Sequence, residues 1–360
     1  MKPIKTALTE QAGVTPQPSI NPRAVALWQQ NKGARPTAAA LIEGIKQHNR
    51  VALSRAITLV ESTLPDWATE AEQLIQFCLM WARPCLRIGI TGVPGVGKST
   101  FIETFGTLLT QQGLKVAVLA IDPSSSLSRG SILGDKTRME TLVNDPLAFI
   151  RPSASGTTLG GVARKTREAM MLCEAFGFDV ILVETVGVGQ SETLVHQMVD
   201  FFLLLKLAGA GDELQGIKRG IMEMADAVII NKADGDNINK ARLAKTEFQR
   251  ALHYFPPKET GWIPKVQCCS AIEGAGVNEV WQLIQQFETE QKQNGHFEQR
   301  RRQQNQQWMR QTIQDQLFQS FMTHPAVQEQ VSQLEQQVEL GVISPFSAAQ
   351  QLIERYRANK

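Results

Sequence analysis

The sequence has little of what builds a disulfide scaffold or a metal store. Its 360 residues include only five cysteines and five histidines. No two cysteines form a C-x-x-C pair, and the histidines form no H-x-x-x-H cluster. Because disulfide frameworks and structural metal sites need such ligand pairs, we expect buried thiols in a reducing compartment.

An excess of charge of one sign is also absent. Lys and Arg number 37 against 35 Asp and Glu, a net charge of +2, and 42% of the residues are hydrophobic. A dedicated nucleic-acid binder would carry a basic surplus, and a disordered chain would have fewer apolar residues. We therefore expect a globular protein of about two or three domains, with no nucleic-acid partner.

Long hydrophobic runs are missing as well. The most apolar stretch, Phe201 to Leu205, is interrupted by Lys206, and no apolar region follows Lys2 and Lys5. A membrane span needs about 20 apolar residues, and a signal peptide needs an apolar core. The sequence predicts a cytoplasmic protein without membrane contact.

The texture of the chain divides it into four parts. Residues 1–23 contain four prolines and little periodicity, which predicts a flexible leader. Residues 24–83 have apolar side chains at helical spacing and predict a helical N-terminal extension. In residues 84–290, short apolar runs alternate with amphipathic stretches, which predicts an α/β domain with a mostly parallel sheet flanked by helices. The expected strands are Leu86–Ile90, Val116–Ile121, Ala148–Ile150, Val180–Val183, Phe201–Leu205, Ala227–Ile230 and Val266–Cys268.

Residues 291–360 are rich in glutamine but contain a spaced set of apolar residues. Trp308, Ile313, Leu317 and Phe321 follow a helical spacing, and breaks fall at Pro325 and Pro345. Low-complexity disorder is the alternative. A long helix with an apolar stripe and no strand partner often packs on a second subunit, so we expect a helical arm that forms a homodimer.

A phosphate-binding pattern follows the first expected strand. The segment that fits G-x-x-x-x-G-K-[ST], with the residue after it, comprises Gly92, Val93, Pro94, Gly95, Val96, Gly97, Lys98, Ser99 and Thr100. Glycines let backbone N–H groups surround a phosphate, and the helix that follows adds the positive end of its dipole. We expect Lys98 to reach the β- and γ-phosphates and Ser99 to bind Mg²⁺.

A base-reading pattern follows a later strand. Asn231, Lys232 and Asp234 form an N-K-x-D set, and Ser270, Ala271 and Ile272 follow the last expected strand. An Asp carboxylate accepts hydrogen bonds from N1–H and the 2-amino group of guanine, a pair of donors that adenine lacks. We expect Lys232 to pack along the base, Asn231 to tie the loops together, and the Ser-Ala pair to offer a backbone N–H to guanine O6. The combination predicts GTP rather than ATP.

Carboxylates at strand ends complete the expected catalytic set. Asp122, Asp135 and Glu184 can converge on one Mg²⁺ and its waters, and the backbone N–H of Gly187 can meet the γ-phosphate. We expect the catalytic residues to be Lys98, Asp122, Glu184 and Gly187, and the metal ligands to be Ser99, Asp122, Asp135 and Glu184. For Asp135, a helix cap is the alternative.

No group for positioning water or stabilising the transition state is evident. Small regulatory GTPases place a glutamine directly after the switch glycine, where this chain has Val188, with Gln190 further on. No arginine finger can be assigned within the chain, although Arg129 and Arg151 are candidates. We therefore predict slow intrinsic hydrolysis that a partner or self-association accelerates.

Seven segments in one order resemble the MeaB/ArgK-type GTPases, over the chain from about residue 50 to its C-terminus. They read GVPGVGKST, AIDPSSS, SILGDKTRM, IRPSASGTTLGG, VETVGVGQSE, GDELQGIKRGI and NKAD. The resemblance implies a SIMIBI-class P-loop G domain with an N-terminal helical extension and a C-terminal dimerisation arm. It also implies a GTP-hydrolysing chaperone that gates adenosylcobalamin delivery to methylmalonyl-CoA mutase, or to a related acyl-CoA mutase, and protects that enzyme.

The partner and its alternatives follow from the same resemblance. The segment 209–220 resembles the extra switch of the family that faces the mutase, although a plain surface loop would look the same. No D-x-H-x-x-G cobalamin pattern occurs, so we expect the mutase to be a separate protein. The alternatives are a kinase of amino-acid-binding transport proteins, a nickel metallochaperone GTPase and a protein-targeting GTPase. A nickel metallochaperone would need a His-rich or Cys-paired region, and a protein-targeting GTPase would need a separate Met-rich domain. This sequence contains neither.

Overall fold

The computed structural model describes residues 36–62, 64–121, 139–152, 159–185, 191–209 and 219–358. The expected leader, residues 1–23, lies outside this range. So do most of the segment 209–220 and three of the expected catalytic or metal residues, Asp122, Asp135 and Gly187.

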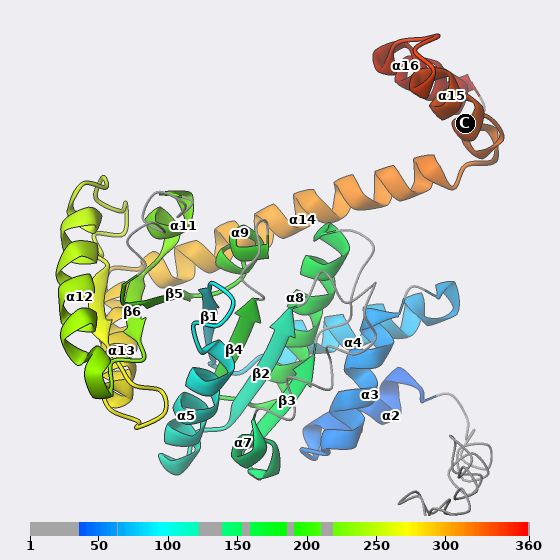
Figure 1. The fold of residues 1–360 in the computed structure, drawn as a ribbon. Helices are drawn as coiled ribbons and strands as arrows, with labels where there is room; N and C mark the ends of the chain where they lie inside the picture. The colour runs from blue at the N-terminus through cyan, green and yellow to red at the C-terminus, as the bar shows by residue number, and fades with distance from the viewer. Residues whose placement is uncertain are drawn as a thin grey trace, which may run out of the picture.

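Seven parallel strands form one sheet at the centre of the molecule (Figure 1), which confirms the predicted fold class. The strand order is β3-β2-β4-β1-β5-β6-β7, and every neighbouring pair is parallel. Each expected strand is found, and several run further than expected at their carboxyl ends. The strands are β1 (Leu86–Gly92), β2 (Val116–Ile121), β3 (Ala148–Pro152), β4 (Val180–Thr185), β5 (Phe201–Leu207), β6 (Ala227–Asn231) and β7 (Lys265–Cys268).

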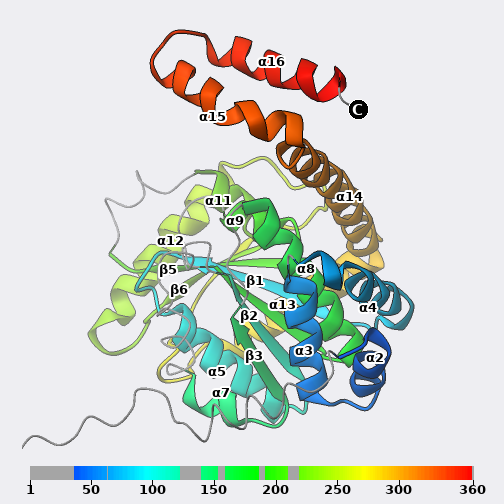
Figure 2. The same ribbon diagram turned by 90° about the vertical axis from the view of Figure 1, so that its right-hand side faces the viewer.

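Both faces of the sheet are buried, because apolar side chains alternate between two cores. On β2, Leu119 and Ile121 belong to one core, whereas Val116 and Val118 belong to the other. The first core is covered by α2 (Ala38–Lys46), α3 (Arg50–Glu61), α4 (Ala68–Trp81), α8 (Leu159–Phe176) and α9 (Ser191–His196). The second core lies under α5 (Lys98–Gln111), α7 (Glu140–Asn144) and α13 (Val277–Gln293) (Figure 2). A third, smaller core lies under α11 (Arg219–Met224) and α12 (Ile238–His253).

Side-chain caps begin the first two helices of the N-terminal extension. The Thr37 hydroxyl accepts from the Ala40 amide at 3.3 Å, and the side-chain Oδ1 of Asn49 accepts from two backbone amides at the start of α3. These caps satisfy amides that have no partner within the helix. A short 3₁₀ helix, Pro65–Trp67, lies between α3 and α4.

Aspartates fix the amino edge of the sheet. Asp179, Asp200 and Asp226 each precede a strand, and each accepts a backbone N–H from a neighbouring segment, at 2.7, 2.8 and 2.9 Å. Asp200 and Asp226 are buried. A buried carboxylate is stable only when charged or hydrogen-bonding partners satisfy it, so the contacts of these two residues hold adjoining elements in place.

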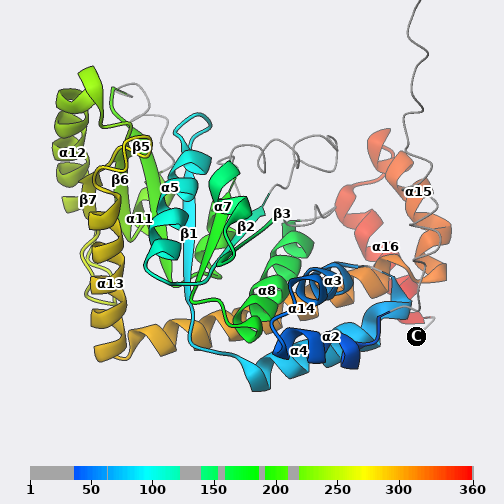
Figure 3. The ribbon, with the colours of Figure 1, turned by 90° about the horizontal axis from the view of Figure 1, so that it is seen from below.

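Three helices form the C-terminal arm. The long helix α14 (His296–Met322) begins beside α13, passes α8 and extends beyond the sheet, where α15 (Pro325–Glu339) and α16 (Pro345–Ala358) pack on each other (Figures 1 and 3). The predicted breaks at Pro325 and Pro345 are the first residues of α15 and α16.

The apolar stripe predicted for this arm is split between two environments. Trp308 packs against the first core of the α/β domain, whereas Ile313 and Leu317 are exposed. The reason is geometric, since a step of five residues along an α-helix rotates a side chain by about 140°. Only Ile313, Leu317 and Phe321 share a face.

None of the described helices has the length and apolar character that crossing a membrane requires.

Candidate functional site

The sheet places the phosphate-loop sequence at a topological switch point. β1 lies between β4 and β5, with β2 and β3 on one side and β6 and β7 on the other. In open α/β sheets, ligands bind outside the carboxyl ends of the strands at the point where the strand order reverses. The loop from Gly92 to Gly97 begins where β1 ends, at this edge.

Glycines allow the loop to take its turn. Gly95 and Gly97 have φ of 79° and 92°, values that side chains with a Cβ rarely adopt. A Cβ on Gly97 would also lie 2.8 Å from Nδ2 of Asn231. Gly97 is therefore required both for its own conformation and for the approach of the base-reading loop.

Lys98 concentrates positive charge at this loop. It is the first residue of α5 and is buried, and its ammonium group donates to the carbonyls of Gly92 at 2.8 Å and Val93 at 3.3 Å. Ser99 and Thr100 lie in the same first helical turn. A helix N-terminus and a lysine ammonium group both favour the binding of phosphate, which agrees with the prediction from the sequence.

One buried amide connects three loops at this edge. Asn231, 1% exposed, donates from Nδ2 to the carbonyl of Val96 at 2.9 Å, and its Oδ1 accepts from the Ala271 amide at 3.1 Å. The phosphate loop, the N-K-x-D turn and the Ser-Ala turn are thereby held together. The sequence predicts that the Ser270-Ala271 pair offers a backbone N–H to guanine O6. In this structure the Ala271 N–H instead donates to Asn231.

The carboxylate expected to read the base is oriented by its neighbour. Ser270 Oγ donates to Asp234 Oδ2 at 2.6 Å and accepts from the Glu273 amide at 3.1 Å. Lys232 Nζ donates to the Gly95 carbonyl at 2.9 Å. The expected base-reading residues therefore lie beside the phosphate loop, while the side chain of Ile272 is 77% exposed.

Two supporting residues were missed by the sequence analysis. Asn237 Nδ2 donates to the backbone carbonyl of Lys232 at 2.6 Å, and Lys232 itself has a φ of 56°. Thr104 Oγ1 donates to the Ala271 carbonyl at 2.6 Å. Neither residue belongs to a recognisable pattern, because each acts only through contacts that folding creates.

The described residues include two of the expected magnesium ligands. Glu184 is buried near the end of β4, in register with Ile90 of the adjacent β1, and Ser99 lies in the first turn of α5. Hydroxyl and carboxylate oxygens suit Mg²⁺, which usually keeps several waters and shares phosphate oxygens. No group of three or more His, Cys, Asp or Glu that could hold a metal occurs within the described ranges. The donor set fits an ion bound jointly with a nucleotide.

One candidate arginine finger is held elsewhere. Arg151 lies on β3 at the edge of the sheet and pairs with Glu61 of α3 at 2.6 Å. It also donates to Ser54 and Thr58. These contacts join the N-terminal extension to the sheet, while the other candidate, Arg129, lies outside the described residues.

Comparisons with known proteins agree with this geometry. The family model described as "Methylmalonyl Co-A mutase-associated GTPase MeaB" matches residues 53–326. The chain belongs to this family of GTPases. The resemblance inferred from the sequence is therefore confirmed, as is the prediction of a GTPase.

Relatives match most of the MeaB-family chain. The probable GTPase Rv1496 of Mycobacterium tuberculosis is 49% identical over 318 residues, covering 88% of this chain and 95% of that protein. The methylmalonic aciduria type A homolog of Mus musculus, described as mitochondrial, is 46% identical, covering 88% of this chain and 79% of that protein. A crystal structure of a LAO/AO transport system kinase is 39% identical with a TM-score of 0.70, covering 89% of this chain and 98% of that one.

Proposed function

We propose that this MeaB-family protein is a Mg²⁺-dependent GTPase chaperone that gates adenosylcobalamin delivery to methylmalonyl-CoA mutase, or to a related acyl-CoA mutase, and protects that enzyme. The connection that Asn231 makes between the phosphate loop and the base-reading turns carries the nucleotide part of the proposal. The family description, which names a mutase, supports the partner.

The chain's own residues have separate roles in this proposal. Backbone amides from Gly92 to Thr100 and the Lys98 ammonium bind and orient the phosphates. Asp234, oriented by Ser270, selects guanine, and Lys232 lines the base. Ser99 and Glu184, with Asp122 and Asp135, would hold Mg²⁺, which supplies charge neutralisation on the phosphates. Gly187 would contribute its backbone N–H.

The expected reaction is slow in the isolated protein. Arg151 is bound to Glu61 and to two hydroxyl groups, so it is not available to stabilise the transition state in this structure. Arginine fingers supplied by a partner accelerate related reactions by about 10³–10⁵-fold. We propose that the mutase, or a second copy of the chain, provides the missing group or orders the site.

We also propose that the arm forms a homodimer. Met309, Ile313, Leu317 and Phe318 of α14 are between 48% and 65% exposed. The spacing of 309, 313 and 317 places them along one side of the helix. An apolar surface of this kind on a projecting helix is typical of a protein–protein interface.

The first experiment measures GTP turnover by the purified chain with and without the mutase from the same cell. We expect a slow rate that rises when the mutase is added. Lys98→Ala should lower the turnover by about 10²–10³-fold while leaving the fold intact, since it removes one phosphate-binding charge. Circular dichroism checks the fold of the variant.

Two results would argue against this proposal. The chaperone role fails if adding the mutase does not change GTP turnover and adding this protein does not change the cobalamin loading of the mutase. The GTPase assignment would still stand. If radioactive γ-phosphate appears on an amino-acid-binding transport protein rather than in solution, the kinase alternative is favoured.

A further inference from the structure

A cavity lies at the opposite edge of the sheet from the phosphate loop. It has a volume of about 400 Å³, is partly open to solvent and is lined mainly by residues of α4, α8 and α14 together with Arg87 at the start of β1. Ligand pockets generally span about 300–1,000 Å³. The cavity is therefore large enough for a small molecule, and nothing in the proposed nucleotide chemistry uses it.

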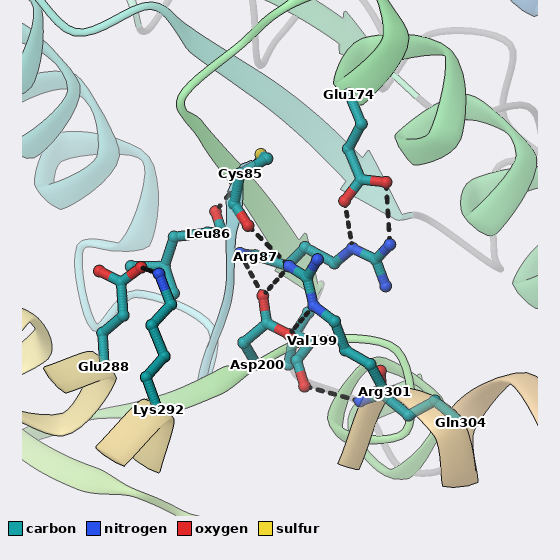
Figure 4. Close-up of polar contacts among 10 residues, drawn as sticks. All are labelled: Cys85, Leu86, Arg87, Glu174, Val199, Asp200, Glu288, Lys292, Arg301 and Gln304. Carbon is teal, nitrogen blue, oxygen red and sulfur yellow. Dashed lines mark hydrogen bonds and ion pairs between the residues drawn. The ribbon is translucent and has the colours of Figure 1, made fainter. Parts of the chain in front are cut away.

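Two of the three arginines in its wall are already paired. Arg87 donates from Nε and Nη2 to the two carboxylate oxygens of Glu174, at 2.6 and 2.9 Å. Arg301 donates to both oxygens of Asp200, at 2.8 and 2.6 Å (Figure 4). Each of these bidentate pairs neutralises its own charge.

The third arginine, Arg167, has no carboxylate partner among the described residues. It is 5% exposed, and its Nη1 donates to the side-chain oxygen of Gln311 at 3.4 Å. Its Nη2 is buried and has no hydrogen-bond partner in the part of the chain that the structure describes. Over the described residues, the wall of the cavity carries three arginines and one carboxylate, that of Glu174. With Asp200, which pairs with Arg301 but does not line the cavity, these groups leave a surplus of one positive charge.

Such an arrangement is costly unless an anion completes it. A buried cation loses its hydration, and only hydrogen bonds and a counter-charge recover that loss. Burial, and then the nearby charge of Arg87, lowers the pKa of Arg167. A second buried atom in the wall, Oε1 of Gln304, also has no hydrogen-bond partner within the described ranges, whereas Nε2 of the same side chain donates to the Val199 carbonyl.

The rest of the wall is mainly apolar, with Leu79, Met170, Met171 and Trp308 from three different helices. We propose that this cavity binds an organic anion with one carboxylate and an apolar body, and that Arg167 binds the carboxylate. One negative charge matches the surplus, whereas a phosphate dianion would add an unmatched charge near Glu174. The bound molecule would contact α4, α8 and α14 together and would fasten the arm to the G domain.

The test uses the full-length protein and a series of monocarboxylates, namely acetate, butyrate, hexanoate and octanoate. We expect one or more of the longer acids to raise the melting temperature and to bind in calorimetry. Hydrogen exchange should slow in residues 167–174 and 301–308. Hexanamide has the same hydrocarbon chain as hexanoate but no charge. Neither hexanamide nor inorganic phosphate should produce any of these three effects.

Variants decide whether Arg167 is the carboxylate partner. Arg167→Met should weaken binding by about tenfold to a hundredfold, since it removes a charge-assisted hydrogen bond. Without ligand it should melt at a temperature equal to or above that of the unmodified protein, because it replaces an unpaired buried cation. Arg302→Met is the matched control, because Arg302 is an exposed arginine on α14 next to Arg301, and it should bind normally.

Four results would overturn the proposal. These are no binding by any acid of the series, equal binding of hexanamide, equal losses in the Arg167 and Arg302 variants, and phosphate binding that depends on Arg167. If Arg167→Met fails to fold, Arg167 has a larger structural role than we infer, and Arg167→Lys replaces it as the test variant. Arg167→Lys keeps the positive charge, so it should bind the acid more weakly than the unmodified protein does, and it should not bind hexanamide.

Discussion

At the scale of single residues, the candidate nucleotide site depends on side chains that orient other side chains. Asn231 bridges three loops, and Ser270 fixes one oxygen of the Asp234 carboxylate at 2.6 Å. Pre-orientation of this kind lowers the entropic cost of binding and sharpens discrimination between bases. Asp234 is therefore the residue at which specificity can be tested most directly.

Asp234→Asn should shift the preference from guanine toward xanthine nucleotides. The amide places a donor where the carboxylate accepted, so it opposes the N–H groups of guanine and suits the additional carbonyl of xanthine. We expect the affinity for GTP to fall by about a hundredfold or more, measured by titration with fluorescent GTP and XTP. Asp236→Asn, an exposed neighbour, is the control. Full GTP affinity in the Asp234 variant would show that this carboxylate does not read the base.

The sequence predicted those residues whose chemistry is local to a motif. The phosphate loop and the N-K-x-D set each occupy a few consecutive positions, so their spacing is visible without a structure. Thr104, Asn237 and Arg167 were not predicted, because their partners come from other elements. Arg167 in particular looks like an ordinary helical arginine until the packing of α4 and α14 shows that it is buried.

At the scale of elements, polar anchors fix the root of α14. Arg301 binds Asp200 and also donates to the Cys85 carbonyl at 2.6 Å, a contact between residues 216 positions apart. Burial alone would raise the pKa of Asp200, but the hydrogen bonds and charges of Arg301 and Arg87 together outweigh burial and lower it. The aspartate is therefore charged at neutral pH and holds the arm.

Arg301→Leu should destabilise the protein by about 3–5 kcal/mol at pH 7, because it leaves Asp200 buried without its main partner. A carboxyl group whose pKa is lowered by folding stabilises the native state above its unfolded value of about 3.9, and this contribution is lost as the pH falls through the folded value. In the variant the buried Asp200 carboxyl gains a proton more readily than in the unmodified protein. The difference in the free energy of unfolding between the two proteins should therefore shrink as the pH falls.

Urea denaturation at several pH values measures this difference, and hydrogen exchange in residues 296–308 reports whether the root of α14 has loosened. Arg302→Leu, which removes an exposed charge from the adjacent position, should change the stability by less than about 0.5 kcal/mol. An Arg301 variant as stable as the Arg302 variant would show that apolar packing, with Trp308, is sufficient to anchor the helix.

At the scale of the whole molecule, the sheet could be predicted and the placement of the arm could not. Parallel strands buried on both faces appear as short apolar runs, and all seven runs became strands. The course of α14 depends on Arg301 and Gln304 meeting the amino edge of the sheet, and neither residue belongs to the apolar pattern. The sequence therefore predicted a helix with an apolar side but not which part of that side stays exposed.

The exposed part of the arm gives the last prediction, that the chain is a dimer through α14. Its 27 residues span about 40 Å, and exposed Met309, Ile313 and Leu317 lie along one side of it. Replacing Ile313 and Leu317 together by Asp should convert the dimer into a monomer, because each charge would be buried in an apolar contact. Light scattering after size-exclusion chromatography measures the mass, and Gln316→Asp on an exposed position of the same helix is the control.

Two outcomes would contradict a dimer through α14. An unmodified chain that is monomeric would exclude self-association, and a double variant that remains dimeric would place the self-association surface elsewhere. If the double variant is monomeric but the mutase still stimulates its GTP turnover, the partner rather than the second copy supplies the missing catalytic group.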